Sequence, residues 1–193
     1  MSNFICSLGN HDHHRLLVEL GKERNIFGKD AFQRIRLGAI IQMTAIGIPM
    51  IWMGEEIGEY KSKTLDMSKI DWTLIEYKLN NSNILNTDLF EFYCGLCRLR
   101  TKNSAFYNST NFQFLHQDNE RKVLVYHRWS DKGDHIVVIL NLSNDYLNDH
   151  RIPNIPLNGK WHEWTLNYDL FVENHQLTIS LTKHEGKILV QTV

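Results

Sequence analysis

The spacing of hydrophobic residues changes near residue 103, and this change limits what the chain can fold into. Before that point, apolar residues recur with the helical period, most clearly over residues 31–46. After it they alternate in short runs, as at Ile136 and Val138, which is typical of strands with one buried face. The sequence therefore predicts an α/β segment over residues 1–103 and an all-β module over residues 104–193.

Within the first segment, the pattern predicts helices and two short buried strands. The expected elements are a strand over residues 4–8, a short helix over 16–20 that Gly21 ends, a helix over 31–46 capped by Asp30, a strand over 48–53, a loop-rich stretch over 58–87 and a helix from Asp88 to about Lys102. The run Ile48–Met53 is apolar throughout, which indicates a strand covered on both faces, as in a parallel sheet.

The second segment contains six or so short alternating runs separated by turn signals. Such signals include Asp131-Lys132-Gly133-Asp134 and Asn158-Gly159. Closely spaced short strands of this kind favour an antiparallel β-sandwich.

Charge and composition exclude several classes of protein. The chain has 21 Lys and Arg against 22 Asp and Glu, a net charge of −1, which argues against nucleic-acid binding and against a polybasic membrane surface. The longest apolar stretch, residues 37–53, is interrupted by Gln42 and Pro49, so no membrane span is expected. Three cysteines in 193 residues predict no disulfide framework, and we expect a reducing, cytoplasmic setting.

Four motifs follow one another in an order that resembles a known family. They are Asn10-His11-Asp12 at the end of the first predicted strand, GIPMIWMGEE over residues 47–56 about forty residues later, Ile70-Asp71-Trp72, and FYCGLCRLR over residues 92–100. Together with the later strands, they resemble the end of the catalytic barrel and the C-terminal domain of the α-amylase superfamily, glycoside hydrolase family 13. The motif over residues 47–56 looks most similar to branching enzymes and trehalose-releasing glucan hydrolases.

The resemblance implies both a fold and a site. Residues 1–103 would be the last two βα units of a (β/α)₈ barrel, followed by an antiparallel β-sandwich. Asp12 would be the family's transition-state-stabilising carboxylate, with His11, Asn10 and Glu55 as substrate-binding residues. The family's nucleophile and acid/base come from earlier strands, which these 193 residues do not match. The implied substrate is an α-glucan oligosaccharide or polysaccharide with α-1,4 or α-1,6 bonds, with no cofactor and no metal.

Two functional hypotheses follow from this resemblance. In the first, the chain is the C-terminal part of a glycoside hydrolase or transglycosidase and is inactive alone. In the alternative, it is a stand-alone, non-catalytic glucan-binding or assembly protein. Uncovered strand edges predict self-association through the barrel remnant, or association with an N-terminal portion. The DNA that precedes the first codon distinguishes the two hypotheses.

Four other patterns have a less specific explanation that we favour. These patterns are the histidines His11, His13 and His14 as a metal site, Glu55-Glu56 as a catalytic pair, Cys94 and Cys97 as a redox motif, and Trp129, Trp161 and Trp164 as sugar-stacking residues. We expect instead solvent-facing histidines, carboxylates that diverge, thiols within an amphipathic helix, and core tryptophans.

Overall fold

The protein folds into two compact units, Ser2–Leu99 and Arg100–Val193. The computed structural model describes residues 4–62, 69–76, 84–107 and 110–192. The boundary between the units lies four residues before the predicted end of the first segment at residue 103. Part of the predicted loop-rich stretch over 58–87 lies outside the described residues. Among the described helices, none combines the length and the apolar character that a membrane span requires.

The N-terminal unit contains two very short strands that pair in parallel. They are β1 (Ile5–Cys6) and β2 (Ile48–Pro49), with Ile5 opposite Ile48. The backbone N–H of Ile48 donates to Phe4 O at 2.8 Å. Gly47 precedes β2 with φ 123°, and a Cβ there would lie 2.7 Å from Phe4 O, so only glycine permits this approach.

Both strands are shorter than predicted, because side chains take the backbone groups that would extend the pairing. The backbone N–H of Met50 still donates to Cys6 O at 2.9 Å. Beyond it, Gln42 Nε2 donates to Met50 O at 2.6 Å. Arg15 Nε donates to Met53 O at 2.8 Å. The apolar run therefore leaves the strand after Pro49 and continues as a loop.

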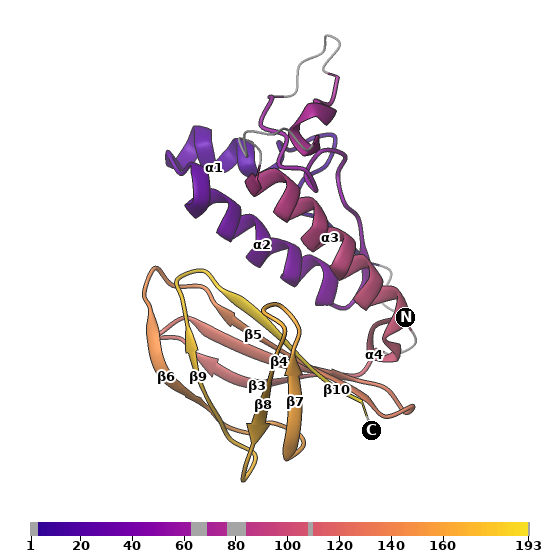
Figure 1. Ribbon diagram of the computed structural model, residues 1–193, viewed down its shortest axis with the longest axis vertical. Coiled ribbons are helices and arrows are strands. Elements are labelled where there is room, and N and C mark those ends of the chain that lie inside the picture. Colours follow the sequence, from indigo (N-terminus) through magenta and orange to yellow (C-terminus); the bar gives the residue numbers. More distant parts are fainter. Residues whose placement is uncertain (1–3, 63–68, 77–83, 108–109, 193) are drawn as a thin grey trace. The chain divides into compact units, whose positions relative to one another are not determined.

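Helices form most of the N-terminal unit (Figure 1). They are α1 (Leu16–Arg24), α2 (Gly28–Thr44), the 3-10 helix η1 (Trp72–Ile75) and α3 (Ile84–Lys102). Packing between α2 and α3 includes the Arg36 guanidinium, which lies 3.9 Å from the centre of the Phe92 ring.

The predicted helix ends were wrong at three places. Helix α1 passes through Gly21 and ends at Arg24, and its C-cap residue Asn25 adopts the left-handed conformation with φ 55°. Asp30 lies inside α2, whose N-cap position is Phe27. Asp88 lies inside α3, four residues after Ile84. In each case packing of the helix extends it beyond the local start or stop signal.

The C-terminal unit is an antiparallel β-sandwich with a short helix, α4 (Ser104–Tyr107), at its start. Its strands are β3 (Phe112–Asp118), β4 (Val123–Trp129), β5 (Asp134–Asn141), β6 (Leu147–Ile152), β7 (Gly159–Glu163), β8 (Tyr168–Val172), β9 (Leu177–Leu181) and β10 (Gly186–Thr192). A six-stranded sheet has the order β3-β4-β5-β10-β7-β8, and β6 pairs with β9 in a second sheet. The predicted sandwich is confirmed. The described residues of this unit form eight strands where the sequence predicted six or so, because the many exposed positions of β6 and β8 obscure their alternation.

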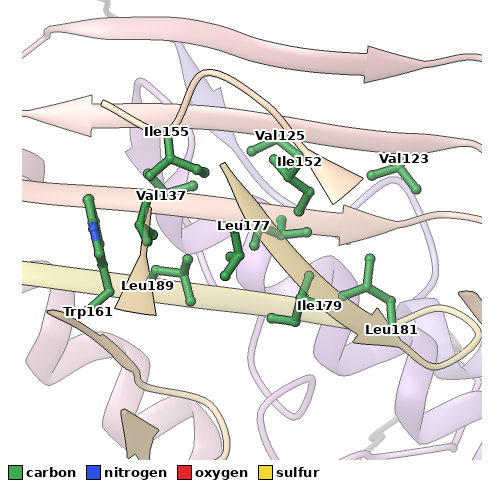
Figure 2. Packing of buried hydrophobic residues seen from close by; sticks show 12 residues of the cluster. Val123, Val125, Val137, Ile152, Ile155, Trp161, Leu177, Ile179, Leu181 and Leu189 are labelled. Carbon is green, nitrogen blue, oxygen red and sulfur yellow. The ribbon is translucent and has the colours of Figure 1, made fainter. Parts of the chain in front are cut away.

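The core of the sandwich lies between its two sheets. Figure 2 shows side chains of β6 and β9, such as Ile152 and Leu181, among those of the larger sheet, such as Val125 and Leu189. Trp161 on β7 is fully buried there, and its Nε1 donates to Leu157 O at 3.1 Å. The prediction that Trp161 belongs to the core, and not to a sugar-stacking surface, is confirmed.

Removal of the Trp161 side chain is expected to destabilise the sandwich strongly. We predict that Trp161→Ala lowers the free energy of unfolding by about 3–5 kcal/mol, because it leaves a large cavity and removes the indole N–H donor. Phe171→Ala on neighbouring β8 is the matched control, because that ring is 68% exposed. Chemical unfolding followed by circular dichroism measures both. Equal losses in the two variants would contradict the core position of Trp161.

Candidate functional site

The segment that follows β1 presents two polar side chains to solvent. Asn10 Oδ1 accepts the backbone N–H groups of Asp12 at 2.8 Å and of His13 at 2.9 Å, which fixes a turn. The side chains of His11 and Asp12 are 79% and 71% exposed, and His11 Nε2 lies 3.3 Å from Asp12 Oδ2. Asn10 therefore acts on the backbone, whereas His11 and Asp12 are accessible to a ligand.

An aromatic ring lies beside this pair. Trp52, from the segment that follows β2, has its ring centre 6.5 Å from that of His11, at an interplanar angle of 52°. The parallel pairing of β1 and β2 brings the two segments together at the carboxyl ends of the strands. A carboxylate and an imidazole next to an indole are the groups that bind sugar hydroxyls and the apolar face of a sugar ring.

Glu55, in the loop after β2, is buried, unlike the exposed side chains of His11 and Asp12. The residue is 2% exposed. Its Oε1 accepts the backbone N–H of Leu16, the first residue of α1, at 3.1 Å. A carboxylate at this place satisfies one of the free N–H groups at the helix N-terminus. That Glu55 contacts a sugar stays a prediction, and its observed contact is with the backbone.

Burial raises the pKa of the Glu55 carboxyl, and the charges of Glu56 and Glu19 add to the shift. The N–H of Leu16 and the charge of Arg15 act in the opposite direction.

Two buried charged residues that the sequence did not single out hold the loop after β2. Arg15 is 8% exposed, and its Nη1 donates to Lys61 O at 3.3 Å in addition to the bond from Nε to Met53 O. Glu59 is 1% exposed and accepts the backbone N–H of Lys61 at 3.0 Å and of Asp71 at 2.8 Å. Composition and periodicity gave no signal for either, because their burial depends on individual contacts with the backbone.

Tyr93 contributes from α3 to the same buried polar region. It is 2% exposed, and burial raises the pKa of its hydroxyl well above the usual range, with further contributions from the charges of Glu55 and Glu56. Buried oxygens of all three side chains have no hydrogen-bond partner within the described residues. Because Glu55 is buried, it does not form an exposed carboxylate pair with Glu56.

The histidines and cysteines that the sequence offered as metal or redox sites lack the geometry for these roles within the described residues. Within the described part of the chain, His11, His13 and His14 do not form a metal-ligand cluster with a further His, Cys, Asp or Glu. Cys94 and Cys97 are half-buried thiols within α3, and burial raises the pKa of Cys97, which disfavours the reactive thiolate.

The charge of Glu55 is expected to cost stability, whereas its hydrogen bond contributes stability. Because burial raises its pKa above the usual 4.5, the folded state loses stability as the pH rises from about 4.5 through the folded pKa. We predict that Glu55→Gln, which keeps the acceptor, removes this decline and is at least as stable as the natural chain at pH 7. Glu55→Ala is expected to destabilise α1 by about 1–2 kcal/mol.

Hydrogen exchange of the α1 amides measures this local stability as a function of pH. Glu23→Gln, an exposed change on the same helix, is the control and should leave the pH dependence unchanged. If Glu55→Gln destabilised α1 as much as Glu55→Ala, the carboxylate charge itself would be required, contrary to the prediction.

Comparison with known proteins covers both units. Residues 2–135 match the family described as "Alpha amylase, catalytic domain", and residues 114–190 match "Alpha amylase, C-terminal all-beta domain". Neopullulanase 2 of Thermoactinomyces vulgaris is 27% identical over 185 residues, which are 94% of this chain and 28% of that protein. The 1,4-alpha-glucan branching enzyme GlgB of Pseudomonas syringae pv. tomato is 27% identical over 155 residues, 79% of this chain and 20% of the enzyme.

Solved structures show the same fold. The structure of AmyP in complex with maltose superimposes with a TM-score of 0.75 at 20% identity and covers 96% of this chain and 40% of AmyP. An alpha-amylase from Anoxybacillus gives a TM-score of 0.76 at 18% identity and covers 98% of this chain and 38% of the enzyme. The chain thus spans less than half the length of these proteins. It belongs to the α-amylase family, with the end of the catalytic domain followed by the C-terminal all-β domain.

Proposed function

We propose that the chain supplies one wall of an α-glucan site, in which Asp12 and His11 bind the hydroxyls of a sugar ring. The observation that supports this most directly is the exposure of both side chains at the carboxyl end of β1, beside Trp52. In (β/α)₈ barrels, the active site lies at this end of the strands. Maltose bound to AmyP is consistent with a glucan as the ligand.

In this proposal the chain binds sugar but does not cleave it alone. Retaining glycosidases place two carboxyl groups about 5 Å apart, one as the nucleophile and one as the acid/base. Asp12 is exposed, whereas Glu55 is buried and bonded to the backbone of α1, so they do not form such a pair. Asp12 would stabilise the transition state by binding the hydroxyls of the distorted ring. Asn10 and Glu55 would act as positioning residues that fix the backbone around it.

The reacting groups would then come from the part of the relatives' length that these residues do not span. With them, the whole protein would hydrolyse or transfer α-1,4 or α-1,6 glucosidic bonds. Two relatives, Neopullulanase 2 and the 1,4-alpha-glucan branching enzyme, are named for reactions of this kind. Because these two relatives are named for different reactions, we propose α-glucans as the substrate class.

A second candidate is a non-catalytic assembly protein, which the exposed apolar residues of the strand pair favour. Phe4, Ile5, Ile48 and Met53 are 76%, 64%, 58% and 60% exposed. Ile5 and Ile48 lie on the two short strands, and Phe4 and Met53 lie in the segments that flank them. Exposed apolar side chains at open strand edges favour coverage by another polypeptide. A second copy of the chain and the remaining strands of a barrel are both suitable occupants.

We predict that the chain binds maltotriose weakly and does not hydrolyse it. In amide-resolved NMR titrations, maltotriose should shift the signals of residues 10–13 and of the Trp52 indole. Asp12→Asn should weaken binding about tenfold or more, because a charge-assisted hydrogen bond is lost. Asp131→Asn, an exposed change in the turn between β4 and β5, is the matched control and should have no effect.

Two results would overturn this proposal. One is the absence of any shift at residues 10–13 at saturating maltotriose. The other is release of reducing ends above a heat-treated control that Asp12→Asn abolishes, since that would place a complete catalytic apparatus within these residues.

We also predict self-association through residues 1–60. Light scattering at micromolar concentration should give a mass above the 22.7 kDa of one chain. Charges introduced by Ile5→Lys and Ile48→Lys, which face one another across the strand pair, should restore the monomer. Phe171→Lys, at an exposed aromatic residue of the other unit, is the control and should not change the mass. A monodisperse monomer of the natural chain would exclude the prediction.

A further inference from the structure

Three side chains with metal-binding chemistry meet in the C-terminal unit, outside the motifs that carry the family resemblance. His116 and Asp118 belong to β3, and His150 belongs to β6. One ligand atom from each lies within 4.8 Å of the others. Because β3 is in the six-stranded sheet and β6 is in the two-stranded sheet, the cluster connects the two sheets of the sandwich.

A β-bulge in β3 turns His116 toward the interior. Phe114 pairs with Tyr126, but the register then shifts, and His116 pairs with Val125. Residues directly opposite in an antiparallel pair share a face, and Val125 is in the core between the sheets. In a regular strand, His116 would share the face of Phe114, which is 49% exposed. The extra residue therefore re-aims the histidine, a recognised effect of bulges near functional sites.

A second bulge does the same for His150. Leu147 pairs with Leu181, and after a register shift His150 pairs with Ile179. Both partners belong to the core, so His150 also faces the interior. Asp149, which a regular strand would place there, adopts φ 47° at the bulge. Independent irregularities in two strands thus bring an imidazole to the same place.

The histidines of the cluster have unused hydrogen-bonding atoms. His150 is 3% exposed, and neither of its ring nitrogens has a hydrogen-bond partner within the described residues. The same is true of the buried Nε2 of His116. The two rings lie 5.8 Å apart between centres. Buried polar atoms without partners cost stability, so a ligand that bonds to them would relieve this cost.

Asp118 completes the set with a negative charge. Its Oδ1 accepts the backbone N–H of Arg121 at 2.9 Å, a bond that orients the carboxylate and leaves its second oxygen for a ligand. The charge of Arg121 interacts with both Asp118 and His150, but its own side chain is exposed in the turn between β3 and β4. This cation would weaken metal binding without blocking it.

We propose that His116, Asp118 and His150 bind a divalent first-row transition metal ion, with Zn²⁺ as the best fit, and that the ion clamps β3 to β6. Two imidazoles and one carboxylate are ligands that Zn²⁺ prefers, and a water molecule would complete a tetrahedral set. Tetrahedral bonds of about 2.1 Å separate ligand atoms by about 3.4 Å, so side-chain rotation must close gaps of about 1.4 Å at most.

The test uses the full chain after chelator treatment and dialysis. Titration with Zn²⁺ should load one ion per chain, measured by elemental analysis, and should raise the midpoint of thermal unfolding. Co²⁺ should give the visible absorption of a tetrahedral site. His116→Gln and His150→Gln should each lower the Zn²⁺ affinity by more than about 100-fold, since even changes around the ligands cost about 10–100-fold. Arg121→Gln should tighten binding.

His162→Gln is the matched control, because His162 Nδ1 also lies beside a carboxylate, 3.0 Å from Asp169 Oδ1, but on the exposed surface of β7 and β8. It should bind Zn²⁺ like the natural chain. His116 is only half-buried, so His116→Gln decides the matter if His150→Gln fails to fold. No binding at equimolar micromolar Zn²⁺ would overturn the proposal. So would an unchanged Zn²⁺ affinity in His116→Gln, because the ion would then bind elsewhere, for example at His11, His13 and His14.

Discussion

The candidate site depends on hydrogen bonds that side chains supply to the backbone groups after β2. The apolar run that begins at Ile48 leaves its strand partner after Pro49, and its carbonyl groups then need other donors. Gln42 and Arg15 supply them at Met50 and Met53. Because these donors come from α2 and from the residue before α1, the loop is fixed to the helices and not to a neighbouring strand.

Backbone N–H groups of the helix and the loop also bond to side chains, but here the backbone donates and a carboxylate accepts. Glu55 accepts from Leu16 at the start of α1, and Glu59 accepts from Lys61 and Asp71. Buried carboxylates are costly unless they are bonded, and here each bond fixes a different segment of chain. The C-terminal unit is stabilised differently, by apolar side chains packed between two sheets, as Figure 2 shows.

The sequence predicted the features that depend on periodicity and missed those that depend on single contacts. The change from helical to alternating spacing identified the two parts of the fold, and the order of motifs identified the family. Strand lengths and the role of Arg15 depend on which side chain reaches which carbonyl group, and no spacing rule contains that information. The inward position of His116 also depends on one bulge, because a shift of one residue changes the face of a strand.

In the N-terminal unit, the side chains of the candidate site are exposed, whereas the charged side chains that bond to the surrounding backbone are buried. His11 and Asp12 contribute almost nothing to packing, since most of each side chain faces solvent. Their position is nevertheless well defined, because Asn10 fixes their turn and Glu55 fixes the adjoining start of α1. A site built in this way can change its exposed groups without loss of the fold. Loss of the Glu55 acceptor would instead leave the backbone N–H at the start of α1 without its partner, four residues after Asp12 in the chain.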